Sequence, residues 1–247
     1  MSKTSNGNQH KTPLTISRHK GHDALVGAHD IAVVIDVIRA FTFAKTAFDS
    51  GTEKILLAET VEAARSLADA HPSAVLAGEI DALPIPGFDV GNSPSQIAAR
   101  GHNKGLDGGT IVHRTTNGTR MAIAALAHSP LVFVTGLSNV QATAARIRAL
   151  HENGATRLLL VATHPTGDED VACGDHLLHL LGLPGGVTET EALDRTRNAD
   201  AAAKFLDPEQ PTFPTDDMAH VLRFDPPVFV MGVEAENSVP VVRKLSL

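Results

Sequence analysis

The chain has 247 residues, and its 21 lysines and arginines against 28 aspartates and glutamates give a formal net charge of −7. This acidic balance offers no basic stripe, and tryptophan and tyrosine are both absent, so nucleic acid is excluded as the expected partner. Hydrophobic residues make up 43% of the chain, which suffices for a sizeable core, but no apolar run approaches the roughly 20 residues of a membrane-spanning helix. We therefore expect a globular cytoplasmic protein that binds a small molecule and no membrane.

The domain organisation follows from composition along the chain. Residues 1–13 are polar and contain no apolar secretion segment, which predicts a flexible N-terminal tail. Residues 14–247 are expected to form a single α/β domain, with a motif-bearing core over 30–181 and a C-terminal extension over 182–247. The single cysteine, Cys173, excludes a disulfide framework and is expected to be buried. Small acidic α/β enzymes often form homo-oligomers, so a homo-oligomer is left open.

Short β-branched runs alternate with longer stretches of helical period between residues 30 and 182. The predicted strands are Ile31–Ile35, Lys54–Leu57, Ala74–Ala77, Thr110–His113, Leu131–Thr135 and Arg157–Val161. Helices are expected between them, including 61–70 capped by Thr60 and 139–150 capped by Ser138. This alternation predicts an α/β fold whose sheet is mostly parallel or mixed and is covered by helices on both faces.

Two further stretches depart from the alternation. The segment Asp81–Pro94 contains three prolines and two glycines, which predicts a long, shaped loop without a strand or helix. After Leu181 the sequence predicts an acidic, Ala-rich helix that ends at Phe205, a proline-rich linker and a last apolar segment, Val228–Val233.

Polar side chains follow the predicted strands. They are Asp36 and Arg39, then Glu79, then Thr115–Thr119, then Ser138 and Asn139, and last the acidic trio Asp168–Asp170. Sites in open α/β sheets form beyond the carboxyl ends of the strands, so we expect these residues to converge on one edge of the sheet.

Asp36 ends a strongly apolar strand, where a carboxylate needs a partner or a metal ion to offset its desolvation. A functional role is favoured, and the alternative is an aspartate that caps the next helix or pairs with Arg39. Arg39 is suited to bind an anion through two parallel hydrogen bonds, although an exposed ion pair explains it equally well.

The sequence T-T-N-G-T places hydroxyls, an amide and a glycine at the start of a predicted helix, where free backbone N–H groups attract an anion. It predicts a phosphate cradle, and ordinary capping is the alternative. Ser93 and Pro94 read as an N-cap and a first helical residue, whereas Asn92 has no such explanation. Asp36, Glu79 and Asp170 supply hard carboxylate oxygens, which favour a Mg²⁺ site over one for a softer metal.

Six ordered blocks together resemble the 2-phosphosulfolactate phosphatase family over roughly residues 30–181. They are V-I-D-V-I-R-A (34–40), A-G-E (77–79), G-F-D-V-G-N-S-P (87–94), R-T-T-N-G-T (114–119), G-L-S-N-V (136–140) and D-E-D-V-A-C-G (168–174). The resemblance implies an α/β, Mg²⁺-dependent phosphatase that releases phosphate from 2-phospho-3-sulfolactate, a step towards coenzyme M. Relatives also occur where coenzyme M is not needed, so another phosphorylated hydroxy acid stays open as the substrate.

The resemblance also implies residue roles. Asp36, Glu79 and Asp170 are placed near magnesium, and Asp36, Arg39 and Asp170 are expected to be catalytic. The residues expected to bind the small anionic phosphorylated substrate are Asn92, Ser93, Thr115, Thr116, Asn117, Gly118, Thr119 and Asn139. The chain departs from the family at Gly174 and Asp175, and Asp175 is expected to add negative charge close to the site.

Two questions of mechanism and class stay open. Hydrolysis proceeds either through a water activated by metal and carboxylate, which we prefer, or through a phosphorylated carboxylate such as Asp36. The alternative class is a non-catalytic module that binds a phosphorylated ligand, and such a module needs no metal carboxylates.

Overall fold

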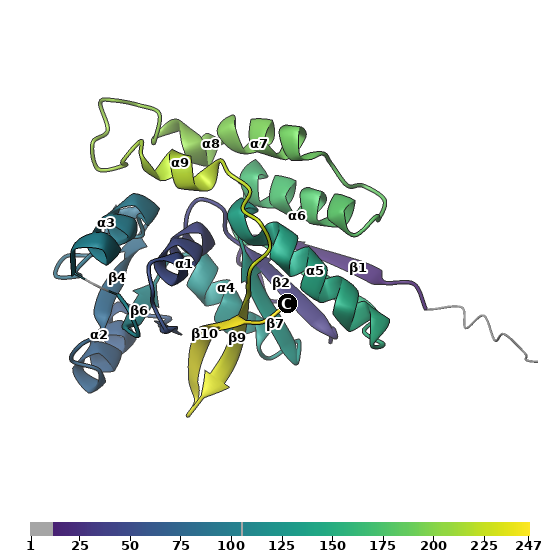
Figure 1. Ribbon diagram of the computed structural model, residues 1–247, viewed down its shortest axis with the longest axis horizontal. Helices are drawn as coiled ribbons and strands as arrows, with labels where there is room; N and C mark the ends of the chain where they lie inside the picture. The colour runs from purple at the N-terminus through teal and green to yellow at the C-terminus, as the bar shows by residue number, and fades with distance from the viewer. Residues whose placement is uncertain (1–11, 105) are drawn as a thin grey trace, which may run out of the picture.

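The computed structural model describes residues 12–104 and 106–247, so the predicted tail lies outside the described residues except for its last two positions. The described chain forms one ten-stranded sheet flanked by helices (Figure 1). The strands are β1 (Thr15–Lys20), β2 (Ile31–Ile35), β3 (Lys54–Leu57), β4 (Val75–Ile80), β5 (Leu83–Pro84), β6 (Thr110–Arg114), β7 (Leu131–Thr135), β8 (Arg157–Ala162), β9 (Val230–Glu236) and β10 (Val239–Leu245). The α/β fold class predicted from the sequence is confirmed.

The sheet is mixed, with the strand order β1-β8-β2-β7-β9-β10-β3-β6-β4-β5. The strands β1, β8, β2 and β7 pair in parallel, as do β3, β6 and β4. Between these two groups lies the antiparallel C-terminal hairpin of β9 and β10, which pairs with β7 on one side and β3 on the other. The last strands of the chain therefore join the two halves of the sheet.

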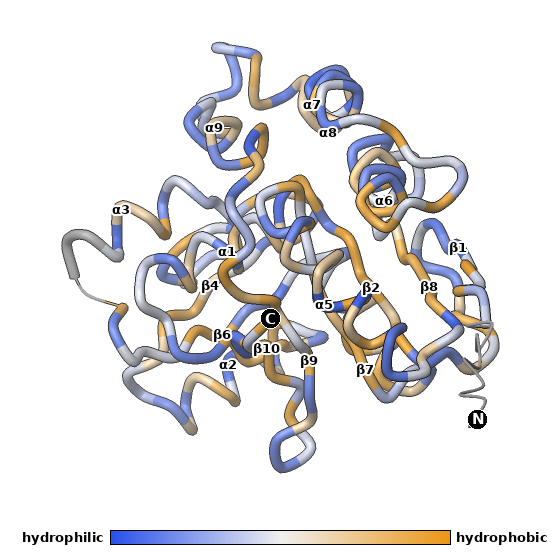
Figure 2. Tube along the Cα trace, turned by 45° about the vertical axis from the view of Figure 1, so that its right-hand side comes forward, coloured by the Kyte–Doolittle hydropathy of each residue, from blue (hydrophilic) through white to orange (hydrophobic). Residues whose placement is uncertain are grey.

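Helices cover both faces of this sheet. They are α1 (Ala40–Asp49), α2 (Val61–Ala70), α3 (Pro94–Lys104), α4 (Gly118–Ala125), the 3₁₀ turn η1 (Leu137–Asn139), α5 (Val140–Glu152), α6 (Asp168–Leu180), α7 (Glu189–Arg197), α8 (Asp200–Ala203) and α9 (Asp217–Val221). The fully buried β2 shows the two faces, since Ala32 and Val34 pack with α1, α3 and α4, whereas Ile31, Val33 and Ile35 pack with α5 and α6. Figure 2 shows the apolar strands enclosed between more polar helices.

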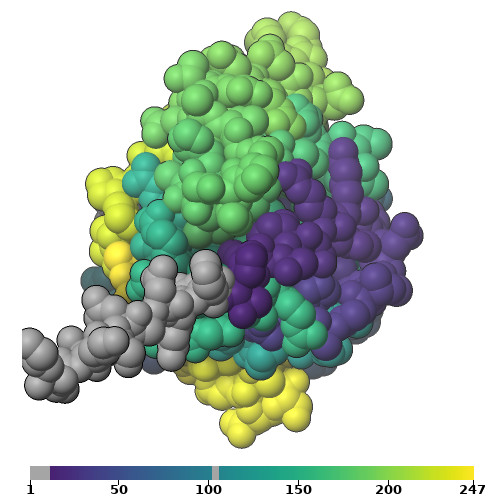
Figure 3. Space-filling model, turned by 90° about the vertical axis from the view of Figure 1, so that its right-hand side faces the viewer, coloured from purple at the N-terminus to yellow at the C-terminus, as the bar shows by residue number. Residues whose placement is uncertain are grey.

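Two helices from the C-terminal half of the chain, α6 and α7, lie over the N-terminal strand β1. Figure 3 shows α6 and α7 lying directly over the atoms of β1 and the segment after it. Asp175 on α6 binds Arg18 on β1 at 2.6 Å and Arg195 on α7 at 2.8 Å, so ion pairs accompany this packing. No helix in the described part of the chain is long and apolar enough to cross a membrane.

The six predicted strands are present, and three of them, β2, β3 and β7, have the predicted limits. The Thr60 cap is confirmed, because its side chain accepts a hydrogen bond from the N–H of Ala63 at 3.1 Å. The Ser138 cap is wrong: Ser138 lies in η1, and α5 starts at Val140 without a side-chain cap.

Other element predictions need correction. The segment 81–94 is not free of strands, because Leu83–Pro84 pairs with β4 across a turn made by Asp81 and Ala82, both at positive φ. The single helix expected to end at Phe205 is two helices, α7 and α8, since Ala199 between them has extended backbone angles. The strand β1 was not predicted at all.

Gly78 allows β4 and β6 to approach closely just before the site. Its φ is +153°, and a Cβ built there would lie 2.0 Å from the carbonyl oxygen of Arg114. Any side chain at position 78 would therefore push the two strands apart and displace Glu79, the next residue.

We expect Gly78→Ala to lower the free energy of unfolding by about 3 kcal/mol, because overpacking adds to backbone strain. Gly154→Ala is the matched control, since Gly154 also has positive φ, but a Cβ added there would have no neighbouring atom within 4 Å. Backbone strain alone should lower the free energy of unfolding of this control by about 1 kcal/mol. Urea unfolding followed by circular dichroism measures both, and equal losses would contradict the close approach of the strands.

Candidate active site

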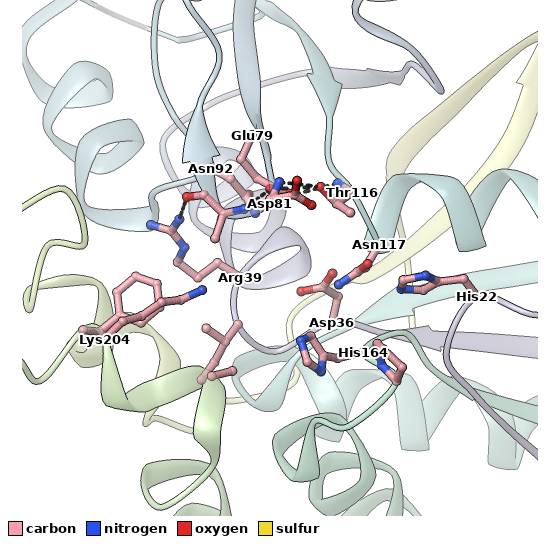
Figure 4. Close-up of a pocket in the computed structure, with 15 residues that line it drawn as sticks. His22, Asp36, Arg39, Glu79, Asp81, Asn92, Thr116, Asn117, His164 and Lys204 are labelled. Atoms are coloured by element: carbon pink, nitrogen blue, oxygen red, sulfur yellow. Dashed lines mark hydrogen bonds between the residues drawn. The ribbon is translucent and has the colours of Figure 1, made fainter. Parts of the chain in front are cut away.

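One cavity of about 300 Å³ lies where the connections after several strands meet (Figure 4). It is lined by His22 after β1, Asp36, Ile38 and Arg39 after β2, Glu79, Asp81 and Ala82 at the end of β4, Asn92 before α3, Thr116 and Asn117 after β6, His164 and Pro165 after β8, and Ala201, Lys204 and Phe205 at α8. The carboxyl ends of the two parallel groups lie at opposite edges of the sheet, because β7 with β9, β9 with β10 and β10 with β3 all pair antiparallel. The expectation that the polar residues converge on one edge of the sheet is therefore wrong, although residues that follow strands of both groups line one cavity.

Six of the predicted site residues line this cavity, and six do not. Those in its walls are Asp36, Arg39, Glu79, Asn92, Thr116 and Asn117. Those outside its walls are Ser93, Thr115, Gly118, Thr119, Asn139 and Asp170.

Asp36 is one of two buried carboxylates that line the cavity, the other being Glu79. The side chain of Asp36 accepts hydrogen bonds from the N–H of Ala40 at 2.9 Å and from the Thr163 hydroxyl at 3.2 Å. It thus contacts the first residue of α1, as in the capping alternative, but it does not pair with Arg39. Burial raises the pKa of Asp36 from 3.8 to about 6, and the nearby carboxylate of Glu79 contributes to this rise.

Asp170 lies behind Asp36, not in the cavity. Its carboxylate accepts hydrogen bonds from the N–H groups of Val37 at 2.8 Å and His164 at 3.1 Å. The Thr163 hydroxyl lies 3.2 Å from both Asp36 and Asp170, yet it has one proton to donate. Burial raises the pKa of Asp170 well above its ordinary value, and the nearby carboxylates of Asp36 and Glu169 contribute to this rise.

Glu79 connects β4 to the T-T-N-G-T turn. Its carboxylate accepts hydrogen bonds from the N–H of Thr116 at 2.6 Å, from the Thr116 hydroxyl at 3.1 Å and from the N–H of Ala82 at 2.5 Å. Arg114 donates to the carbonyl oxygen of Glu79 at 2.7 Å. These bonds fix the wall of the cavity opposite α8.

Some residues of the T-T-N-G-T turn line the cavity, and the others stabilise the turn from outside it. Thr115 and Thr119 bond each other, each backbone N–H donating to the other's hydroxyl at 2.9 and 3.0 Å. Gly118 begins α4 against Asp36, where an added Cβ would lie 2.7 Å from the Asp36 carboxylate. Asn117 faces the cavity beside Asp36, and its Oδ1 is buried without a hydrogen-bond partner among the described residues (Figure 4).

Arg39 is held by α9. Its guanidinium donates to Asp217 at 2.6 Å and lies 4.5 Å from the ring centroid of Phe205. The same Asp217 accepts hydrogen bonds from the Ser93 hydroxyl at 2.7 Å and from Ser95, so Ser93 supports Arg39 from outside the cavity. Ser93 also caps α3, as predicted, by accepting from the N–H of Gln96 at 3.3 Å.

Two amides have different positions. Asn92 lines the cavity, and its Oδ1 lies 3.1 Å from Nε2 of His113. Burial lowers the pKa of His113 to about 3, so His113 is neutral and its Nε2–H donates to Asn92. Asn139 is buried in η1 away from the cavity, and its Nδ2 has no partner among the described residues.

Sequence reasoning missed several residues here. His164 follows β8, so the strand-end rule that found Asp36 would also have found it, whereas His22 follows β1, a strand that was not predicted. Glu169 is buried beside Asp36, and neither of its carboxylate oxygens has a partner among the described residues. Burial raises the pKa of Glu169 to about 7, with a contribution from Asp36. Lys204 comes from a segment in which the sequence offers no motif.

The oxygen atoms of the cavity residues suit a magnesium ion that is bound by only one or two protein ligands. Within residues 12–104 and 106–247, no three His, Cys, Asp or Glu side chains stand close enough together to hold a metal ion. Mg²⁺ is usually bound through one or two carboxylates, waters and substrate phosphate, so Asp36 and the unpartnered Oδ1 of Asn117 are suitable hard-oxygen ligands.

Asp175 does not bring negative charge to the cavity, contrary to expectation. It is not among the cavity residues, and Arg18 and Arg195 both pair with it. The departure from the family pattern at this position therefore leaves the charge of the cavity unchanged.

Carboxylates, an arginine, amides and the start of a helix gather around one small cavity at strand ends, an arrangement that α/β enzymes use to bind a small anionic substrate. The model of the 2-phosphosulpholactate phosphatase family matches residues 17–221. The chain belongs to this family.

Curated relatives agree with this assignment. A probable 2-phosphosulfolactate phosphatase of Bacillus subtilis is 37% identical over 94% of this chain and 99% of its own length. Proteins of the same name from Deinococcus radiodurans and Thermus thermophilus are 39% and 32% identical, over 65% and 75% of this chain and 67% and 77% of their own lengths.

We expect Asp36→Asn to stabilise the fold in a pH-dependent way when a chelator is present. The raised pKa means that ionised Asp36 lowers stability as the pH rises from about 4 to 6, and this cost stays constant above pH 6. The variant should therefore gain about 3 kcal/mol in free energy of unfolding at pH 8 and nothing at pH 4.

Asp30→Asn is the control of opposite sign. Hydrogen bonds from Thr156, and then from Arg157, lower the pKa of Asp30 to about 2, so its loss should destabilise the protein at pH 8. Urea unfolding at the two pH values measures both variants, and a gain for Asp36→Asn that is equal at pH 4 and pH 8 would contradict the raised pKa.

Proposed function

We propose that the protein is a Mg²⁺-dependent phosphatase that hydrolyses the phosphate monoester of 2-phospho-3-sulfolactate, or of a related phosphorylated hydroxy acid, to the hydroxy acid and phosphate. The observation that carries this proposal is the contact between Asp36 and the start of α4. A carboxylate and a helix N-terminus share one small cavity there, and Gly118 lets them approach. Family membership and the names of the relatives support the substrate.

The substrate would be bound mainly by groups that carry positive charge or donate hydrogen bonds. The phosphate would lie against the first turn of α4, where the helix dipole and the N–H groups other than that of Thr119, which donates to Thr115, attract an anion. Asn92 is placed to donate from its amide, since its Oδ1 is already engaged by His113. Arg39 adds a cation whose orientation is fixed by Asp217 and Phe205.

Bound magnesium would supply positive charge to the phosphoryl oxygens and lower the pKa of an attacking water. Asp36 would hold the metal or orient that water, and the hydrogen bond from Thr163 fixes the carboxylate for this purpose. Glu169, buried beside Asp36, has a pKa raised to about 7 by burial, but it does not line the cavity and would act on the substrate only through Asp36. The preferred route is direct attack by water, and a phosphorylated Asp36 is the alternative.

The first experiment measures phosphate release from 2-phosphosulfolactate and from a panel of phosphorylated hydroxy acids, with Mg²⁺ and with a chelator. The protein must be quantified without absorbance at 280 nm, because it contains no tryptophan or tyrosine. We expect release that needs Mg²⁺ and is fastest for one acid of the panel. No release from any ester, with ligand binding intact, would instead favour the non-catalytic binding module.

Asp36→Asn should lower kcat by a factor between about 10² and 10⁴ while the protein stays folded, because the amide cannot bind metal or accept a proton as the carboxylate does. Asp30→Asn serves again as the control, since Asp30 pairs with Arg157 outside the cavity and should leave kcat unchanged. Unchanged turnover in Asp36→Asn would refute the assigned role.

A further inference from the structure

Lys204 lines the cavity from the C-terminal part of the chain. It follows α8 directly, and Figure 4 shows it with Arg39 on one side of the cavity, across from Asp36, Asn117 and the two histidines. Its ammonium lies 5.7 Å from the ring centroid of Phe205 and 5.0 Å from that of Phe213. The two rings thus hold the ammonium at the wall of the cavity.

Lys204 differs from Arg39 in having no ion-pair partner among the described residues, although the carboxylates of Glu79 and Glu169, which lie beyond ion-pair distance, act to raise its pKa. Arg39 pairs with the fully buried carboxylate of Asp217 at 2.6 Å. No carboxylate in the described part of the chain lies within ion-pair distance of Lys204, although it is half-buried. Burial lowers the pKa of Lys204, and the nearby Arg39 lowers it further. An unpaired, partly desolvated ammonium beside a second cation is unfavourable in the free protein, and a bound anion relieves it.

The phosphate is expected at the other side of the cavity. The start of α4, Asn117 and Asp36 lie there, and these are the groups that suit phosphate and a metal ion. A phosphate ester in that position extends its remaining atoms toward α8, along walls that include Ala201 and Phe205. The volume of about 300 Å³ lies at the lower end of the range for ligand pockets and admits only a small ester.

We propose that Lys204 binds the second anionic group of the substrate, a sulfonate or carboxylate on the carbon skeleton that also bears the phosphate. This inference rests on the proposed phosphatase function. Lysine presents a compact charge that needs no bidentate partner, which suits a rotating sulfonate or carboxylate at the end of a short chain. The cavity thus selects small phosphate esters that carry another strong anion, and the C-terminal segment supplies that selectivity.

The test is Lys204→Met in the full chain with Mg²⁺, assayed with three esters. These are 2-phosphosulfolactate, 2-phospholactate, which lacks the sulfonate, and glycerol 2-phosphate, which lacks both additional anions. We expect KM for 2-phosphosulfolactate to rise about 10- to 100-fold with kcat nearly unchanged, because truncating one member of a charge pair costs a factor of this size or more. KM for glycerol 2-phosphate should not change.

The result with 2-phospholactate identifies the group that Lys204 binds. A rise in KM for 2-phosphosulfolactate alone assigns the sulfonate, and a rise of similar size for 2-phospholactate assigns the carboxylate. A rise of equal size for all three esters, or for none, would overturn the inference.

Two control variants separate charge from packing. Lys204→Arg keeps the charge and should retain most of the affinity for 2-phosphosulfolactate. Lys244→Met removes another lysine that lies over two phenylalanine rings, at 5.9 Å from Phe48 and 5.8 Å from Phe229, but it lies outside the cavity. This second control should leave all three KM values unchanged.

Calorimetry separates a failure of this inference from a failure of the proposed function. Binding of 2-phosphosulfolactate and of inorganic phosphate is measured for the wild type and for Lys204→Met. If Lys204→Met loses affinity for the ester and keeps it for phosphate, the inference stands even when no ester is hydrolysed. Equal affinity of both proteins for the ester overturns the inference, whatever the turnover, and a wild type that neither binds nor hydrolyses any ester overturns both.

Discussion

The site depends on one constraint, the burial of the Asp36 carboxylate without a direct cationic partner among the described residues. Hydrogen bonds from Ala40 and Thr163 satisfy it only in part, and burial raises its pKa to about 6. The start of α4 has to come close to this carboxylate, which explains the glycine at position 118, where a Cβ would lie 2.7 Å from it. A local cost in stability is thus concentrated where a bound cation can offset it.

Three buried carboxylates contribute to this local cost in stability. Asp36, Glu169 and Asp170 are buried together; Asp36 raises the pKa of both Glu169 and Asp170, and Glu169 also raises that of Asp170. Full ionisation of all three is unfavourable, so protons or a bound cation must compensate. The Thr163 hydroxyl links two of these acids, since it lies 3.2 Å from both Asp36 and Asp170.

The sequence predicted the buried strands well because their residues report local properties. The run Ile31–Ile35 is apolar throughout and matches β2, whereas β1 contains Arg18, His19 and Lys20 at a sheet edge and has no such pattern. The strand-end rule likewise brought Asp36 and other polar residues to one cavity. It could not tell which of successive residues faces the cavity, so it included Asn139, which is buried elsewhere. The strand-end rule could not identify Asp217 and Lys204, because the packing of distant helices, not a local motif, places them in the site.

The most direct measurement of the central claim is the titration of Asp36 itself, by the ¹³C chemical shift of its carboxyl carbon in protein labelled at aspartate. Asp36→Asn identifies the resonance by its loss. The account predicts a pKa near 6 in the metal-free protein, from the burial of the carboxylate, and a clear decrease when Mg²⁺ is added. A pKa near the ordinary value of 3.8, or one that Mg²⁺ does not change, would contradict it.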